Sequence, residues 1–291
     1  NHAMTAVDAA RRLKHRTYRL SLPLIRRGYE LTEPLVRWWH QRFPYRYTPA
    51  DFGDLFVAHH TEPFDAGSAA AVPRVIYAFW TGDNEMPEVR RRNLDTLVEV
   101  NPTIEVRLVT ADNLHEHLIP GQPLHPAFSH LSFIHRSDYL RCYMMNFHGG
   151  GYADIKAHRN DWSPAFDRLA ASDAYVLGYR NPVRWMTPNF ADPALQRLMV
   201  RTSDQRIGQA DFICRPGTPY TREWWRRLNE ILDERSEALA LYPGSLNRSE
   251  DPYAIGFTEI LAQIIDPLSV KYHHRLLYDE IIKFDGSVPY V

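Results

Sequence analysis

A continuous apolar run at residues 75–79, Val-Ile-Tyr-Ala-Phe, constrains the fold of this chain more than any other segment. A strand that is apolar on both faces is typical of a parallel sheet covered by helices on both sides. A helical pattern at 87–100 and a second strand-like run at 105–109 follow it, which predicts a strand, a helix and a parallel strand. Further strands and a long helix are predicted at 174–178, 211–214 and 219–239. We therefore expect an α/β fold with a mixed, mainly parallel sheet flanked by helices.

A helix-to-strand joint at residues 137–156 is the most informative segment for function. Ser137 is a suitable N-cap, apolar residues follow at helical spacing, and the glycines at 149–151 end the helix where positive φ angles are needed. Asp138 and Arg141 are three residues apart, so they share one face of this helix. There they could form an ordinary surface ion pair, or offer acceptors and donors to a ligand.

The residues after the glycines, Tyr-Ala-Asp-Ile at 152–155, are typical of a short strand. Alternation sends Tyr152 and Asp154 to the same face, and Asp154 lies near the end of the strand. Acidic and basic groups thus meet around the joint, which indicates a site for an anionic ligand rich in hydroxyl groups.

The joint resembles a family of sugar transferases with a DxD motif. The family includes capsular polysaccharide transferases, Golgi mannosyl- and galactosyltransferases and, more distantly, the glucosylating bacterial toxins. Its pattern is Ser-Asp-x-x-Arg followed by Gly-Gly-x-Tyr-x-Asp-x-Asp, and this chain matches it from Ser137 to Asp154. A second match lies at 72–82, where Val-Pro-Arg-Val-Ile-Tyr-Ala-Phe-Trp-Thr-Gly is similar to the opening segment of the family. Lys156 stands where the family has its second aspartate.

The resemblance implies a GT-A-type glycosyltransferase domain at 71–291, preceded by a basic helical region at 1–70. Residues 1–3 of that region are typical of an expression scar. The implied enzyme is a hexosyltransferase of polysaccharide biosynthesis or a related pathway, which transfers a sugar with retention from a nucleotide diphosphate sugar, UDP- or GDP-sugar favoured. The acceptor would be a hydroxyl of a glycan, a lipid-linked glycoside or a small-molecule glycoside. Family analogy does not fix the particular donor or acceptor.

The resemblance, together with the chemistry of Lys156 and the aperiodic segment 180–190, suggests roles for individual residues. The expected catalytic residues are Arg141, Asp154 and Lys156. Residues of both motifs are expected to bind the donor: Trp80, Thr81, Gly82, Asp138, Arg141, Gly150, Tyr152 and Asp154. Trp80 would stack on the base, or would be a buried core tryptophan. The acceptor or lid side is expected to include Trp185, Gly256 and Thr258, with the aperiodic segment 180–190 as the lid.

Lys156 leaves open how a diphosphate is held. Its ammonium could neutralise the leaving diphosphate in place of a metal, aided by His158 or Arg159. Alternatively Lys156 only pairs with Asp154, and the domain is an inactive nucleotide-sugar-binding module.

The third interpretation keeps the divalent metal. Mn²⁺ or Mg²⁺ requires oxygen ligands and bridges diphosphate oxygens. Asp154 would be one ligand, and Asp161 or the pair His273-His274 would complete the site.

Charge is unevenly distributed along the chain. The formal net charge is −1, yet residues 5–47 hold ten Lys or Arg residues against three acidic ones, a local charge of +7. The basic residues alternate with Leu, Ile and Trp, which predicts either amphipathic helices in peripheral contact with an anionic membrane or a helical subdomain with a solvated basic face. A membrane-surface adaptor is therefore another alternative to an enzyme. No nucleic-acid recognition motif accompanies the charge, so nucleic acid is not an expected partner.

Two features bear on the compartment. No apolar run approaches the roughly 18 to 20 residues that a membrane helix needs. Cys142 and Cys214 are the only cysteines, and Cys142 lies inside the predicted helix, so we expect no disulfide. These features predict a cytoplasmic protein, peripheral at the inner membrane face if residues 5–47 bind lipid.

Overall fold

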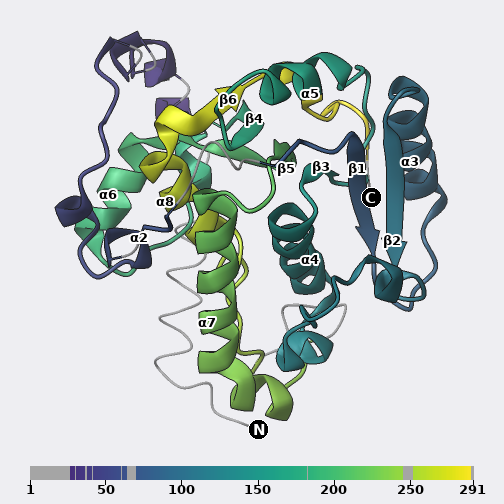
Figure 1. Cartoon of the computed structure of the whole chain (residues 1–291). Coiled ribbons are helices and arrows are strands. Elements are labelled where there is room, and N and C mark those ends of the chain that lie inside the picture. The colour runs from purple at the N-terminus through teal and green to yellow at the C-terminus, as the bar shows by residue number, and fades with distance from the viewer. Residues whose placement is uncertain are drawn as a thin grey trace, which may run out of the picture.

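A computed structural model describes residues 27–29, 31–36, 38–40, 42–59, 61–63, 70–181, 183–244 and 252–289. In this part of the chain one sheet has the strand order β2-β1-β3-β5-β4-β6 (Figure 1). The strands are β1 (Val75–Trp80), β2 (Glu105–Thr110), β3 (Gly150–Ala153), β4 (Val176–Arg180), β5 (Ile207–Cys214) and β6 (Leu276–Tyr278). Among the described strands, β5 alone pairs antiparallel with its neighbours, β3 and β4, which confirms the mixed, mainly parallel sheet.

The sheet is buried on both faces, as the apolar run at 75–79 predicts. Tyr77 and Phe79 of β1 join a core cluster with residues of α4 (Phe133–Phe147), α7 (Pro219–Leu241) and α8 (Ala262–Lys271). Ile76 points to the opposite face and joins a second cluster with residues of α3 (Glu88–Val100) and α5 (Ser163–Ala170). Period-two alternation along β1 therefore supplies both cores.

The joint differs from the prediction in where its two elements begin. Helix α4 begins at Phe133, because the Ser132 hydroxyl accepts the His135 N–H and caps it, so Ser137 lies inside the helix. Strand β3 begins at Gly150 and ends at Ala153, so Asp154 directly follows it instead of lying within it.

Two glycines, not three, turn the chain between α4 and β3. Gly149 and Gly150 have φ angles of 69° and 95°, the left-handed region that favours glycine. A Cβ at Gly150 would also lie 2.8 Å from the Val75 carbonyl oxygen, so this position lets β3 approach β1.

Several elements were not anticipated by the periodicity. They are α5, α6 (Pro193–Arg201), β6, α2 (Phe56–His59) and the 3-10 turns η1 (Pro49–Phe52), η5 (Arg184–Met186), η6 (Ser203–Gln205), η7 (His273–Arg275) and η8 (Glu280–Ile282). Two further 3-10 turns, η3 (Leu114–His117) and η4 (Pro126–His130), lie between β2 and α4.

The described residues before position 64 contain helical backbone at 27–29, 31–36 and 38–40, drawn in purple in Figure 1. Phe52 and Val57 of the segment that follows belong to the core cluster of α4, α7 and α8. The boundary expected at residue 70 adjoins residues 64–69, which lie outside the described residues, as do residues 1–26. In the part of the chain that the structure describes, no helix is long and apolar enough to cross a membrane.

Candidate functional site

The two sequence motifs end at the same edge of the sheet. Strands β1 and β3 pair in parallel, with Tyr77 opposite Tyr152, so their carboxyl ends lie side by side. Asp154 follows β3 there, and the Trp80-Thr81-Gly82 segment ends β1. Ligands of open α/β sheets bind at this edge.

Four charged side chains meet at the end of β3, and we call Asp138, Arg141, Asp154 and Lys156 the charge cluster. The Arg141 guanidinium lies 3.2 Å from the Asp138 carboxylate and 3.5 Å from that of Asp154. The Lys156 ammonium lies 2.9 Å from the other Asp154 oxygen. Residues of α4 and of the segment after β3 thus form one alternating array of charges.

Arg141 is the centre of the charge cluster. Its Nη1 donates to the Gln209 carbonyl at 2.8 Å, and its guanidinium lies 4.4 Å from the centre of the Tyr152 ring. Burial alone would lower the pKa of Arg141, but Tyr152, Asp138 and Asp154 raise it, so the cation persists. The side chain is therefore a fixed positive charge inside the fold.

Asp154 is the most accessible acid of the charge cluster, with a quarter of its side chain exposed. The Tyr152 hydroxyl donates to its Oδ1 at 2.6 Å, and Lys156 covers its Oδ2. Burial raises the pKa of Asp154, but Arg141 and Lys156 together lower it below its ordinary value. Asp154 is thus ionised, with both oxygens engaged.

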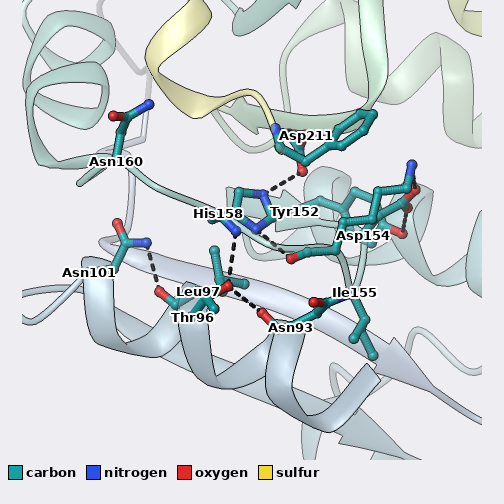
Figure 2. A network of polar contacts seen from close by, with 12 residues as sticks. Asn93, Thr96, Leu97, Asn101, Tyr152, Asp154, Ile155, His158, Asn160 and Asp211 are labelled. Carbon is teal, nitrogen blue, oxygen red and sulfur yellow. Dashed lines mark hydrogen bonds and ion pairs between the residues drawn. The ribbon is translucent and has the colours of Figure 1, made fainter. Parts of the chain in front are cut away.

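The loop that carries Asp154 and Lys156 rests on α3. Arg90 donates to the Ile155 carbonyl at 2.8 Å, and the Thr96 hydroxyl accepts the His158 N–H at 2.9 Å. Figure 2 shows this support, with His158 between Thr96 of α3 and Asp211 of β5.

His158 and Asp211 form a buried pair behind Lys156. The His158 Nε2 lies 3.0 Å from Asp211, and its Nδ1 lies 2.9 Å from the Lys156 carbonyl oxygen. A carbonyl can only accept, so Nδ1 carries a hydrogen and the pair fixes the backbone of Lys156. Burial raises the pKa of Asp211, and the bond to His158 opposes that rise.

The C-terminal segment covers this pair. The other Asp211 oxygen accepts the Phe284 N–H at 3.0 Å, and the Phe284 ring lies 4.0 Å from the Lys156 ammonium. Arg159, expected to assist Lys156, instead turns to Asp285 of this segment at 2.5 Å and is largely exposed.

The remaining donor-motif residues lie at the end of β1 or at the start of β3. Trp80 is half-buried and its indole N–H donates to the Asn84 carbonyl at 2.9 Å, so it is not a fully buried core residue. Thr81 is buried, and Gly82 is packed so closely that a Cβ would lie 2.9 Å from Phe133. Gly150 lies at the opposite end of β3 from Asp154, and its local role is the close approach to β1.

The three residues expected on the acceptor side belong to two segments. Gln263, which the sequence did not single out, joins these segments. Trp185 lies in η5 of the expected lid, and Gly256 and Thr258 precede α8. The Gln263 amide donates to the Asn189 carbonyl at 3.1 Å and to the Thr258 hydroxyl at 3.3 Å, which holds the lid segment beside Thr258.

The residues named as further metal ligands are engaged elsewhere. Asp161 accepts the Ser163 N–H at 2.8 Å, and His273 contacts the Tyr278 hydroxyl at 3.0 Å. Among the described residues, no group of three His, Cys, Asp or Glu side chains is placed to hold a metal ion.

Comparison with known proteins adds little to this geometry. No protein-family model and no curated protein matches the chain. Among solved structures, a chain titled "PaToxG Glycosyltransferase" matches with a TM-score of 0.40 and 10% sequence identity, over 70% of each chain. A likeness this remote says nothing about what the present chain binds or catalyses.

Proposed function

We propose that this protein is a glycosyltransferase with a GT-A-type domain at 71–291, which transfers a hexosyl group from a nucleotide diphosphate sugar to a hydroxyl acceptor. The observation that carries the proposal is the charge cluster at the carboxyl ends of β1 and β3. Asp138 and Asp154 supply acceptors for sugar or ribose hydroxyls, and Arg141 and Lys156 supply fixed donors for phosphate. Trp80 at the neighbouring strand end supplies an aromatic surface for the base.

We propose that Lys156 stabilises the departing diphosphate directly. The Asp154 Oδ1 already accepts from Tyr152, and Oδ2 already faces the Lys156 ammonium. A divalent cation would need this same carboxylate and would lie against Lys156, so the residues present do not suit Mn²⁺ or Mg²⁺. An ammonium provides the electrostatic part of a metal's role without its coordination geometry.

The proposed transfer breaks the bond between the sugar C1 and the β-phosphate oxygen. The electron pair leaves with the diphosphate, where Lys156 and Arg141 stabilise the negative charge. The acceptor oxygen bonds to C1 from the same face, and its proton passes to the departing phosphate oxygen, which gives retention. No protein nucleophile takes part in this step.

The experiment measures sugar release and transfer with UDP-, GDP- and dTDP-sugars, each with excess EDTA and with Mn²⁺. We expect turnover with one nucleotide class that survives EDTA. Lys156→Met should lower kcat about 10²- to 10³-fold, the usual effect of removing one charge-stabilising donor. The matched control is Arg159→Met, because Arg159 is exposed and turned away to Asp285. Activity abolished by EDTA and restored by Mn²⁺ would contradict the metal-free proposal.

A second candidate is a nucleotide-sugar-binding module without turnover. The 2.9 Å pair between Lys156 and Asp154 favours it, because a closed ion pair can hold both groups away from a ligand. Nucleotide sugars would then raise the melting temperature, since a ligand stabilises the state that binds it, but no sugar would be released. Any nucleotide-dependent turnover excludes this candidate.

A further inference from the structure

The N-terminal helical residues turn their polar side chains toward the rest of the fold. The Arg184 side chain of η5 donates to the Tyr29 carbonyl at 2.9 Å and to the Thr32 hydroxyl at 2.7 Å, and it pairs with Glu33 at 3.2 Å. Further along the segment, the His40 Nδ1 lies 2.8 Å from the Asp204 carboxylate. Hydrogen bonds, ion pairs and the Arg184 guanidinium, 4.6 Å from the centre of the Tyr29 ring, thus attach this segment to η5 and η6.

The same N-terminal segment also carries large apolar side chains that are mostly exposed to solvent. It carries five large side chains that we call the apolar stripe, with exposures of 77, 70, 59, 55 and 55% for Leu31, Leu35, Trp38, Trp39 and Phe43. Their spacing of four, three, one and four residues keeps them along one side of a helix. This arrangement is the reverse of an ordinary surface helix, whose apolar face meets the core.

Basic side chains adjoin the apolar stripe. Arg42 is exposed and, four residues after Trp38, lies on the same side of the helix, and Arg46 is exposed in the extended segment that follows the bend at Phe43. A hollow of about 240 Å³ adjoins the apolar stripe, and it is lined by Trp39, Phe43 and Tyr45 together with Arg201. The region 5–47 has a local charge of +7. Exposed tryptophans with neighbouring arginines are the composition of a helix that lies in a membrane interface.

We propose that the apolar stripe docks on an anionic lipid bilayer. Trp38, Trp39 and the leucines would enter the boundary between headgroups and acyl chains, and Arg42 and Arg46 would contact lipid phosphates. A neutral partner surface would match the apolar residues but not the basic ones, and a second copy of this chain would bring the same positive charge against itself. An anionic bilayer matches both features.

The docking proposal does not depend on the charge cluster or on sugar transfer. If both proposals hold, the helix brings η5 and Trp185 of the expected acceptor side to the membrane, because Arg184 joins η5 to the helix. That further step favours a lipid-linked acceptor, and it rests on the proposed function.

The test is sedimentation of the full chain with vesicles of phosphatidylcholine alone and of phosphatidylcholine with 30% phosphatidylserine. We expect binding to the anionic vesicles that weakens in high salt. The double variant Trp38→Ser/Trp39→Ser should bind at least about tenfold more weakly, because it removes two large apolar side chains from the interface. The matched control is Leu241→Ser/Tyr242→Ser, two neighbouring side chains that are 73 and 49% exposed at the far end of α7.

Two readouts separate the outcomes. Asp138→Asn, placed in the charge cluster, should bind vesicles normally, so a failure of sugar transfer and a failure of docking are distinguishable. Equal binding by both double variants would overturn the proposal. So would a dimer in light scattering that Trp38→Ser/Trp39→Ser dissociates without any vesicle binding by the parent chain, because the stripe would then be a contact between two copies.

Discussion

The charge cluster holds four ionisable side chains, two of them buried and two partly buried, whereas the apolar stripe exposes five large apolar side chains to solvent. Asp138 and Arg141 are 3 and 8% exposed, while Leu31 and Trp38 are 77 and 59% exposed. Each arrangement reverses the usual distribution of residues in a soluble fold. In the cluster each charge lies beside an opposite charge. In the stripe, the described residues leave more than half of each apolar side chain in contact with water.

Other buried ion pairs show what a purely structural cluster looks like in this chain. Arg206 and Asp266 lie 2.9 Å apart at 0 and 1% exposure, and Lys271 and Glu223 lie 2.8 Å apart at 4 and 0%. Both pairs are closed to solvent, whereas Asp154 retains a quarter of its surface. Buried ion pairs are therefore not in themselves evidence of a ligand site. The charge cluster differs from the two structural pairs because a ligand can reach Asp154.

The largest expected effect comes from removing the centre of the cluster. Arg141→Ala would leave Asp138 and Asp154 buried without their shared cation and the Gln209 carbonyl without its donor. We expect the free energy of unfolding in urea to fall by about 3 to 5 kcal/mol, the usual result of breaking a buried pair.

The control for Arg141→Ala is another pair with the same helical spacing. Arg91 lies 3.9 Å from Glu88, three residues earlier, and both side chains are more than half exposed. Arg91→Ala should change the free energy of unfolding by no more than about 0.5 kcal/mol. Similar losses in the two variants would show that the Arg141 guanidinium is as well solvated as that of Arg91.

A smaller and more local effect is expected at the inner face of the N-terminal helix. Arg184→Ala removes the donors to Tyr29 and Thr32 and the partner of Glu33. Since a hydrogen bond to a charged group contributes about 1.5 to 3 kcal/mol, amide hydrogen exchange at 31–36 should accelerate about tenfold or more. The control Met186→Ala changes an exposed neighbour in η5 and should leave exchange unaltered. Unchanged exchange in Arg184→Ala would mean that apolar contacts hold the helix, against the proposed orientation of its faces.

Local sequence patterns predicted the elements that depend on neighbours in the chain. The two-sided apolar run at 75–79 predicted a buried strand, and the spacing of Asp138 and Arg141 predicted a shared helix face. Both follow from periods of two and 3.6 residues, which need no long-range information. The predicted start of α4 was wrong because both Ser132 and Ser137 are suitable caps by residue type. The hydrogen bond to Ser132, which the sequence does not show, identifies the true cap.

Contacts between distant segments could not be predicted in the same way. His158 and Asp211 are 53 residues apart, and Phe284 comes to Lys156 from the end of the chain. A signal was present in Asp211, a charged residue at the start of an otherwise apolar run at 211–214, because a buried acid requires a partner. The orientation of the N-terminal helix was also beyond the sequence, since mixed basic and apolar residues do not show which face meets the fold.

Acidic pH should reduce the contribution of Asp154 to the free energy of unfolding. The lowered pKa of Asp154 means that its stabilising effect is fully present above its unfolded-state pKa, about 4, and is lost as the pH falls through the folded-state value. In Asp154→Asn, the loss of unfolding free energy between pH 6 and pH 3 should therefore be smaller than in the parent chain, which urea unfolding at the two pH values measures.

The pKa of Asp211 is shifted in the opposite direction to that of Asp154. Its pKa is raised, so the folded state holds the proton more tightly than the unfolded state, and stability falls as the pH rises through the folded-state value. In Asp211→Asn, this fall in the free energy of unfolding with rising pH should be absent. Parallel pH profiles for the two variants would contradict these opposite environments.

The smallest expected effect on stability is at the apolar stripe. Trp38→Ala should change the free energy of unfolding by no more than about 0.5 kcal/mol, because its side chain already faces water in the folded state. The same substitution at Trp224, which is 1% exposed, should cost about 3 to 5 kcal/mol.

In the presence of anionic vesicles, Trp38→Ala should differ from the parent chain in its resistance to urea. A surface that binds only the folded chain raises its apparent stability, so vesicles should protect the parent chain from urea more than they protect Trp38→Ala. Equal protection would place the lipid contact elsewhere on the basic region. A large loss of stability for Trp38→Ala without any vesicles would mean that the indole is packed within the fold, and the apolar stripe would then resemble an ordinary core face instead of the inverse of the charge cluster.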